Sequence, residues 1–313
     1  PGGLAVVDIV ASMIFAAMTG AGAATTAAVG GMMIPHMEEE GYDPGFASAI
    51  QAMGGVFGPI IPPSTLMVLY AVASGESVGG MFLGGILPGL YLGLVLIIVV
   101  VMLCKKKGYG GGAKFNGKAF VKATVDAFWA LLAPIIILGG IYSGIMTPTE
   151  SSAVCCFYCM IVGLFIYREL SVKDLVKVVA EGVKSSAGIM LIVAATQVFG
   201  WVLTRAQIPQ TIAKMFTENV SNGTVFLFAV CLILLVAGCF IDAVPALLIF
   251  APIFCPTAQA YGLNMVHFGV VMVVVLCIGL ATPPVGINLY VASSVGGQPV
   301  HKIIPHLPIP LLT

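Results

Sequence analysis

The amino-acid sequence predicts an all-α polytopic membrane protein that contains two copies of one helical unit. Of its 313 residues, 59% are hydrophobic and only 8% are charged, whereas a soluble domain carries about 25% charged residues. The apolar residues form long runs, and two Pro-Pro pairs recur in matching surroundings. A chain this apolar could not cover its surface in water, so we expect a lipid bilayer to be its main partner.

Several apolar runs approach the length of a membrane-spanning helix. A helix needs ~17–25 residues to cross a hydrocarbon core of ~30 Å, and runs near this length cover residues 81–104, 128–146, 152–167 and 188–203. Many of the 38 glycines and 19 prolines fall inside apolar runs. Helix breakers persist at membrane depth only where the freed backbone is buried in protein or lines a cavity. This combination favours a transporter over a simple anchor.

Basic residues predict the orientation of the spans, because cytoplasmic loops carry an excess of Lys and Arg. The cluster at 105–107, followed by Lys114, Lys118 and Lys122, marks a cytoplasmic loop. Residues 126–146 then run outward, 152–167 return, and 187–204 run outward again. This topology places eleven basic residues inside and two, Arg205 and Lys214, outside.

The two ends of the sequence suggest part of a longer protein. The chain begins with proline, carries no recognisable signal sequence, and stops inside what reads as the start of another apolar helix. We expect further spans on both sides, with residues 299–313 beginning a truncated C-terminal segment.

A constant offset of 221 residues aligns the chain with itself, and we call this alignment the repeat register. The matching positions are Pro35 with Pro256, Gly41 with Gly262, Gly58 with Gly279, Pro62-Pro63 with Pro283-Pro284, Ala71 with Ala292, and Gly75 with Gly296. The predicted topology makes the segment through the first Pro-Pro pair run outward and the segment through the second run inward, so the copies are inverted. Inverted repeats with interrupted helices at corresponding positions indicate a transporter's binding site near the bilayer midplane.

Each copy contains a helix that is broken in its middle. A proline removes an amide donor and clashes with the preceding turn, so a Pro-Pro pair ends one helical half and can begin another. We expect broken helices over residues 46–74 and 264–294, interrupted at 58–64 and 279–286.

Ahead of each broken helix lies a pair of apolar arms around a tip. The first tip is 19–26, within a hairpin over 4–35, and the second is 241–245, within a hairpin over 223–259. The arms are short for full spans, which favours re-entrant hairpins. The alternative is an ordinary tight contact between helices, because small residues also let helices approach closely.

The repeat and the predicted spans divide the chain into four parts. Residues 1–75 form the first repeat, and residues 76–186 form scaffold helices and cytoplasmic loops. Residues 187–298 form the second repeat, which adds a helix at 187–204 and an outer arm at 207–220 before its hairpin. The last part is the segment from 299.

Four motifs make the chain resemble the large membrane subunit of tripartite ATP-independent periplasmic (TRAP) transporters, the DctM-like permeases. They are GPIIPPS at 58–64, FLGGILPG at 82–89, GGIYSGIMTPTE at 139–150 and IGLATPPVGINL at 278–289. They are spread over almost the whole chain and are specific in combination. One departure lies in the first tip, where the family often has Ser-Gly-Ser and this chain has Thr19-Gly20-Ala21.

The resemblance implies an elevator-type fold like that of the ion-transporter superfamily, in a multi-pass protein of the bacterial inner membrane. It implies a small DctQ-like membrane subunit and a DctP-like periplasmic substrate-binding protein as partners, and no nucleic acid. The cargo it implies is a small organic acid, such as a C4-dicarboxylate or sialic acid, driven by Na⁺ as the coupling ion without any cofactor.

Oxygen donors at the two breaks would suit sodium, because hard cations take carboxylate, carbonyl and water oxygens and unwound half-helix ends supply carbonyls. We expect one substrate or sodium site where the first tip meets the first break, and its counterpart where the second tip meets the second break. The candidates at the first site are Thr19, Gly20, Gly22, Thr25, Thr26, Gly58, Pro62, Pro63, Ser64 and Thr65. The candidates at the second site are Asp242, Pro245, Gly279, Thr282, Pro283, Pro284, Gly286 and Asn288.

Asp242 is the candidate acid inside an apolar stretch, and buried charges are costly enough to indicate function. It could ligate an ion, carry a proton, or cap a hairpin helix. Because no arginine lies at membrane depth, we expect helix N-termini, whose free amides suit anions, to hold a substrate carboxylate.

Two other functions are alternatives to this reading. A stand-alone sodium–carboxylate symporter of related architecture would need no periplasmic binding protein. An intramembrane enzyme would need a concentrated catalytic constellation, and the sequence has no HExxH and no GxSxG motif. Sodium is favoured over protons as the coupling ion, because proton relays need chains of intramembrane acids or histidines.

Overall fold

The computed structural model describes residues 2–109, 117–220 and 222–307, and every regular element in these ranges is helical. The chain divides into two compact units. One comprises residues 1–112 with 200–313, and the other comprises residues 113–199. The prediction of an all-α chain is confirmed for the described residues.

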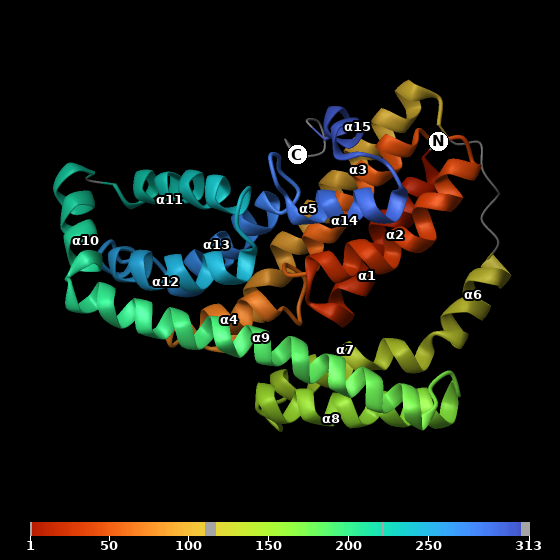
Figure 1. Cartoon of the computed structure of the whole chain (residues 1–313), viewed down its shortest axis with the longest axis horizontal. Coiled ribbons are helices and arrows are strands. Elements are labelled where there is room, and N and C mark those ends of the chain that lie inside the picture. Colours follow the sequence, from red (N-terminus) through yellow and green to blue (C-terminus); the bar gives the residue numbers. More distant parts are fainter. Residues whose placement is uncertain (1, 110–116, 221, 308–313) are drawn as a thin grey trace. The chain divides into compact units, whose positions relative to one another are not determined.

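The first part of the larger unit is a hairpin, a broken helix and a long helix (Figure 1). In chain order these are α1 (Gly3–Thr19), α2 (Gly22–Glu39), α3 (Pro44–Gly54), the 3₁₀ turn η1 (Gly55–Phe57), α4 (Thr65–Ser74) and α5 (Val78–Lys107). α5 contains Pro88 and ends at Gly108, whose φ of 74° permits the left-handed conformation that closes the helix.

The second part of the larger unit repeats this order. It contains α10 (Ile208–Asn219), α11 (Gly223–Gly238), α12 (Ala243–Ala260), α13 (Met265–Gly279), α14 (Ile287–Gly296), α15 (Val300–Ile303) and the 3₁₀ turn η3 (Ile304–His306). In the repeat register α2 corresponds to 243–260, which are the bounds of α12, and α4 corresponds to 286–295, against 287–296 for α14. The offset seen in the sequence therefore also relates the helices.

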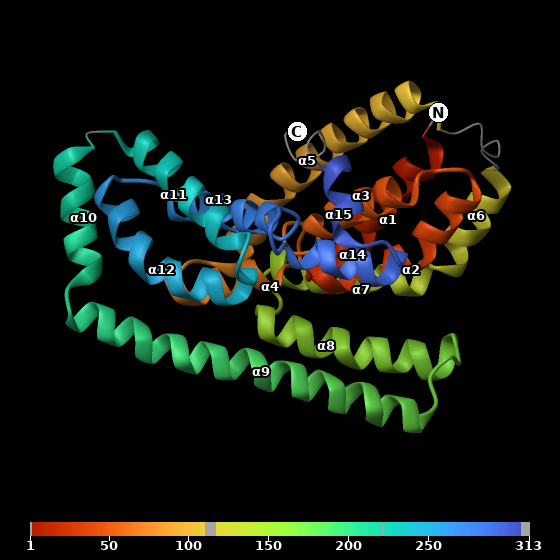
Figure 2. The ribbon, with the colours of Figure 1, turned by 45° about the horizontal axis from the view of Figure 1, so that its top comes forward.

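Each broken helix is shared between the two copies. α4, the second half of the first broken helix, packs on α12 and α13, while α14, the second half of the other, packs on α2 and α3 (Figures 1 and 2). Tyr70 of α4 donates its hydroxyl to the carbonyl of Met265, 2.9 Å away, and its ring covers Gly269 of α13. Gly296 of α14 lies against Ser48 and Ile34 in the same way. This exchange ties the two copies into one body.

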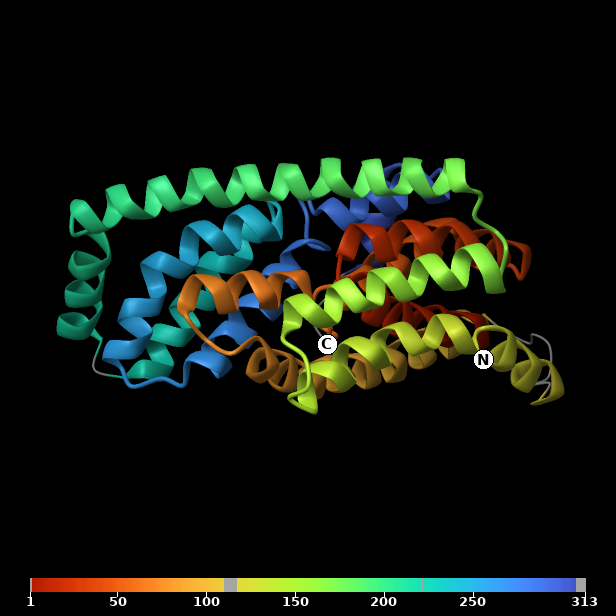
Figure 3. The same cartoon turned by 90° about the horizontal axis from the view of Figure 1, so that it is seen from below.

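The smaller unit contains α6 (Gly117–Asp126), α7 (Phe128–Tyr142), α8 (Pro148–Ile161), the π-helical turn η2 (Val162–Ile166) and most of α9 (Val172–Arg205). α7 and α8 pack side by side (Figure 3). The turn between them is closed by a capping box, in which the amides of Thr147 and Glu150 each bond the side chain of the other residue.

Four helices in the described ranges are long and apolar enough to cross a membrane. They are Val78–Lys107, Pro148–Ile166, Val172–Arg205 and Ala243–Ala260. Shorter apolar helices of 10–17 residues include α1, α4, α7, α11 and α13.

Three helices differ from the prediction in their bounds or length. α9 is one continuous helix of 34 residues, about 51 Å long, so the expected start of a helix at 187 falls in its interior (Figure 3). The second arms of both hairpins are 18 residues long and continue through internal prolines, Pro35 in α2 and Pro252 and Pro256 in α12. Arm length is therefore a weaker argument for re-entrant hairpins than the sequence indicated.

Candidate functional site: two tip–break junctions

The first hairpin tip touches the first helix break through glycines. Gly20 ends α1 with φ of 62°, and a Cβ added to it would lie 2.7 Å from the carbonyl oxygen of Pro63. A Cβ on Gly58 would lie 2.5 Å from the carbonyl group of Ala21. Both approaches are closer than any side chain allows, so glycine is what lets the two backbones meet. We call this contact the first junction.

The hydroxyl groups at the first junction are bonded locally. Thr19 and Thr25 share a hydrogen bond of 3.0 Å between their Oγ1 atoms, and Thr25 and Thr26 each donate to a carbonyl four residues earlier, at 3.0 Å. Ser64 caps α4, accepting from the amide of Met67 at 3.2 Å and donating to the carbonyl of Pro59. Thr25, Thr26 and Ser64 are buried. Each of these hydroxyl oxygens still has lone pairs with which it could ligate a cation.

Two helix N-termini converge on the first junction. The amide of Gly22, at the start of α2, lies 2.7 Å from the position of a Cβ on Gly58. The amide of Thr65, at the start of α4, lies 3.3 Å from the position that a Cβ on Gly20 would occupy. The first amides of a helix lack partners within the helix and form the positive end of its dipole, so this place suits an anion. Pro62 is buried, Pro63 is half-buried and Thr65 is exposed.

The second junction is made by backbone hydrogen bonds. The carbonyl of Cys239, at the end of α11, accepts from the amides of Val285 and Gly286 at 3.1 and 3.2 Å. Beside it, a Cβ on Gly279 would lie 2.6 Å from the Cα of Gly238. Thr282 donates to the carbonyl of Ile278 at 2.7 Å. In the second copy it is therefore the end of the first hairpin arm, just before the tip, that meets the break, with fewer side-chain oxygens.

Asp242 stands at the N-cap position of α12, but its side chain makes no capping hydrogen bond and is exposed. Of the three roles considered for it, helix capping is the one that the structure contradicts. Pro245 lies in the first turn of α12, where a missing amide costs no helical hydrogen bond. The bonds of Pro283 and Pro284, like those of the first Pro-Pro pair, include a cis peptide between the two prolines.

Asn288 was assigned to the second junction from the sequence, and its side chain lies at the first. Its backbone amide bonds the carbonyl of Leu280 at 2.9 Å, within the second break. Its side-chain Nδ2 donates to the carbonyl of Ala52 at 3.4 Å, and its Oδ1 faces Gly22. This correction follows from the exchange of half-helices, which the sequence alone did not reveal.

Sequence reasoning missed a set of polar side chains behind the first junction. They are fully buried, and each has an atom without a hydrogen-bond partner: Asp8, Ser12, Ser48 and Gln51. The available signal was a carboxylate inside the apolar run 4–18, followed one turn later by a hydroxyl. In the described ranges no group of three or more His, Cys, Asp or Glu side chains could hold a metal ion.

Two junctions between hairpins and broken helices, in a chain whose described ranges contain four helices apolar enough to cross a membrane, are the features expected of a membrane permease. The family model described as the DctM component of tripartite ATP-independent periplasmic transporters matches residues 1–311, and the chain belongs to this family.

Three relatives illustrate the range of the family. The chain is 43% identical to the C4-dicarboxylate TRAP transporter large permease protein DctM of Pseudomonas aeruginosa, over 97% of its own length and 71% of the relative's. It is 38% identical to the sialic acid TRAP transporter large permease protein SiaM of Vibrio cholerae, over 96% and 71%. It is 42% identical to the isethionate TRAP transporter permease protein DctMQ of Oleidesulfovibrio alaskensis, over 97% of the chain and 48% of that protein.

Proposed function

We propose that this chain carries a small organic anion across the bacterial inner membrane together with sodium, as the large permease of a TRAP transporter. The cargo is a carboxylate or a similar anion, because the relatives are named for C4-dicarboxylate, sialic acid and isethionate. In this proposal the partners are a DctQ-like membrane subunit and a DctP-like periplasmic binding protein. The joint name DctMQ of one relative supports the first of these.

The observation that carries the proposal is that each hairpin meets its own helix break, through its tip in the first copy and through the end of α11 in the second. At the first junction, two helix N-termini and buried hydroxyl oxygens lie within one contact. Such a place offers amides to an anion and oxygens to a hard cation. Because the anion and the cation would neutralise each other, binding of one favours binding of the other, which is what coupling requires.

The proposed mechanism is an elevator movement of the inverted hairpins and broken helices, as re-entrant elements, against the remaining helices. The substrate is held by the amides at the starts of α2 and α4 and not by Arg205, which lies at the exposed end of α9. A structure with a bound substrate carboxylate paired to Arg205 would contradict this assignment.

The test is uptake by the full-length permease reconstituted into liposomes with both partner proteins and a panel of radiolabelled carboxylates. We expect uptake under a sodium gradient, and no uptake under a proton gradient alone. Uptake that needs only protons would overturn sodium coupling. Uptake without the periplasmic protein would favour the alternative, a stand-alone sodium–carboxylate symporter.

A further inference from the structure

Asp8 lies in the middle of the apolar helix α1, and none of the described residues pairs with its charge. Its exposed fraction is 0%, and neither carboxylate oxygen accepts a hydrogen bond. The two ion pairs recorded in the described ranges involve other residues. An isolated carboxylate in an apolar interior is strongly unfavourable, so this position calls for a neutralising partner.

Two further oxygens without a hydrogen-bond partner among the described residues lie close together, one helical turn along α1 from Asp8. Ser12 follows it by four residues, which places both side chains on one face of α1. The Ser12 Oγ is 2.6 Å and the Gln51 Oε1 is 3.9 Å from the position that a Cβ on Gly54 would occupy. Both atoms are buried and lack a hydrogen-bond donor. The Ser12 Oγ of α1 and the Gln51 Oε1 of α3 thus both lie beside Gly54.

The amide of Gln51 is held in one orientation. Its Nε2 donates to the carbonyls of Thr25 and Thr26, each at 3.3 Å. Because the nitrogen is fixed toward α2, the amide oxygen is left on the side of Gly54, where the Ser12 Oγ also lies. Two hydrogen bonds therefore orient the Gln51 side chain so that its oxygen, an acceptor, has no donor among the described residues.

Three contacts place Asp8 at the level of Gln51. Near the start of α1, Gly2 bonds the carbonyl of Tyr109, whose ring stacks on that of Tyr42 just before α3. Further along, Ser12 meets Gly54, and at the tip Gly20 meets Pro63. The helices therefore run in the same direction, and Asp8, one turn before Ser12, lies beside the turn of α3 that contains Gln51.

We propose that Asp8, Ser12 and Gln51 bind a sodium ion between α1 of the first hairpin and α3, as a site separate from the first junction. Asp8 precedes Thr19 by eleven residues, which is about 16 Å along α1. One carboxylate, one amide oxygen and one hydroxyl match the hard oxygen ligands that such a cation takes, and a single negative charge suits a monovalent ion. If Asp8 were protonated instead, its O–H group could donate one hydrogen bond, and the remaining oxygens of the three side chains would still lack a partner.

The site belongs to one copy of the repeat. The repeat register relates Asp8, Ser12 and Gln51 to Ala229, Ile233 and Met272. The second copy thus offers three apolar side chains in place of three oxygens. The proposal rests on the proposed sodium-coupled transport and adds to it one bound ion that the second copy cannot match.

The experiment measures equilibrium binding of ²²Na⁺ to the full-length permease purified with its membrane partner, so that it requires neither substrate nor transport. Asp8→Asn keeps the shape of the side chain and removes its charge, and we expect it to bind one sodium ion fewer than the wild type. Glu181→Gln, which removes an exposed carboxylate on α9, is the matched control and should bind as the wild type does. Equal binding by Asp8→Asn and the wild type would overturn the site.

Two milder variants cover the case in which Asp8→Asn does not fold. Ser12→Ala and Gln51→Met each remove one oxygen and keep the carboxylate. We expect each to raise the sodium concentration at half-saturation by at least about tenfold, as loss of a ligand-shell group does at metal sites. An unchanged sodium concentration at half-saturation in both variants would also overturn the proposal. Loss of sodium-driven uptake with Asp8-dependent binding retained would instead contradict the proposed function alone.

Discussion

The two copies of the repeat share a backbone and differ in chemistry. In the first copy the tip and break carry Thr19, Thr25, Thr26 and Ser64, and the repeat register relates these to Phe240, Ala246, Leu247 and Val285. The first junction is surrounded by buried oxygens, whereas the second is closed by backbone bonds to the carbonyl of Cys239. A duplicated fold has therefore kept two junctions while concentrating side-chain ligands at one of them.

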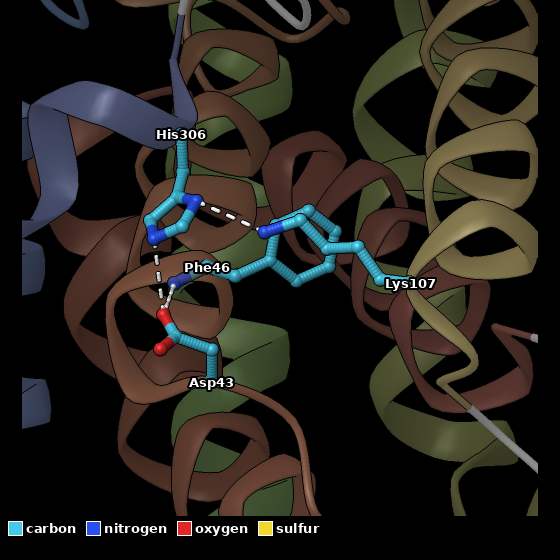
Figure 4. A network of polar contacts seen from close by, with 4 residues as sticks. All are labelled: Asp43, Phe46, Lys107 and His306. Carbon is cyan, nitrogen blue, oxygen red and sulfur yellow. Dashed lines mark hydrogen bonds and ion pairs between the residues drawn. The ribbon is translucent and has the colours of Figure 1, made fainter.

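The same contrast appears at the start of each broken helix. Asp43 and Asn264, which are equivalent, cap α3 and α13 by accepting from the amides of Phe46 and His267 at 2.9 and 3.0 Å. Only Asp43 extends this cap into a charged network in the described ranges (Figure 4). His306 Nε2 lies 3.0 Å from Asp43 Oδ1, and Lys107 Nζ lies 3.2 Å from His306 Nδ1 and 4.8 Å from the centre of the Phe46 ring.

The largest effects are expected where the copies agree. Gly58→Ala and Gly279→Ala would each place a Cβ against backbone atoms, at 2.5 and 2.6 Å, and backbone cannot move aside as a flexible side chain can. Overpacking of this kind costs about 1–3 kcal/mol, and we expect both variants to lose most of their sodium-driven uptake. Gly3→Ala, with open space around its Cβ, is the control and should transport normally. Loss of uptake in only one of the two variants would mean that transport requires only one of the two junctions.

Asn288→Met makes the copies alike at one position, because Met67 is the equivalent residue. The change removes the hydrogen bond to the carbonyl of Ala52, and such a bond contributes about 1 kcal/mol. We expect the apparent sodium affinity in uptake assays to fall roughly fivefold, the factor that corresponds to this energy. Met67→Leu, at the equivalent position in the other copy, should leave sodium affinity unchanged. Equal effects of the two changes would contradict the contrast between the copies.

Ser64→Ala tests the cap that only the first copy has. Loss of a Ser N-cap costs ~1 kcal/mol, and we expect the melting temperature of the purified permease to fall by a few degrees. Val285→Ser should give no matching gain, because Gly286 is the residue that caps α14. A gain in melting temperature for Val285→Ser would show that the second break can accept a side-chain cap.

The smallest effect concerns pH and the network around His306. Partial burial and the nearby Lys107 lower the pKa of His306 below its ordinary value of about 6.5, although Asp43 acts in the opposite direction. The folded protein thus favours the neutral imidazole, so this contribution to stability is present above about pH 6.5 and is lost as the pH falls below it. We expect His306→Gln to reduce the decline in melting temperature between about pH 6.5 and 5.5. An unchanged decline would assign it to other groups.

The sequence predicted the helical elements well, because prolines and glycines mark both breaks and both tips. The repeat register located Gly58 and Gly279 at equivalent positions from the sequence alone, and in the structure both lie against the backbone of their own hairpin. The exchange of half-helices was missed, since periodicity within a segment does not say which partner a short helix chooses. Asp8 was missed although it lies inside the apolar run 4–18, because its complete burial and its lack of a hydrogen-bond partner depend on tertiary packing.

Cross-linking between α2 and α14 tests the exchange of half-helices most directly. A Cβ on Gly31 would lie 4.0 Å from Val295 Cγ1. In a background without the native cysteines, Gly31→Cys combined with Val295→Cys should form a disulfide under mild oxidation in membranes. Pro252→Cys, the position equivalent to Gly31 in the second copy, combined with Val295→Cys should not. A disulfide in the second pair and none in the first would contradict the account, because α14 would then pack within its own copy.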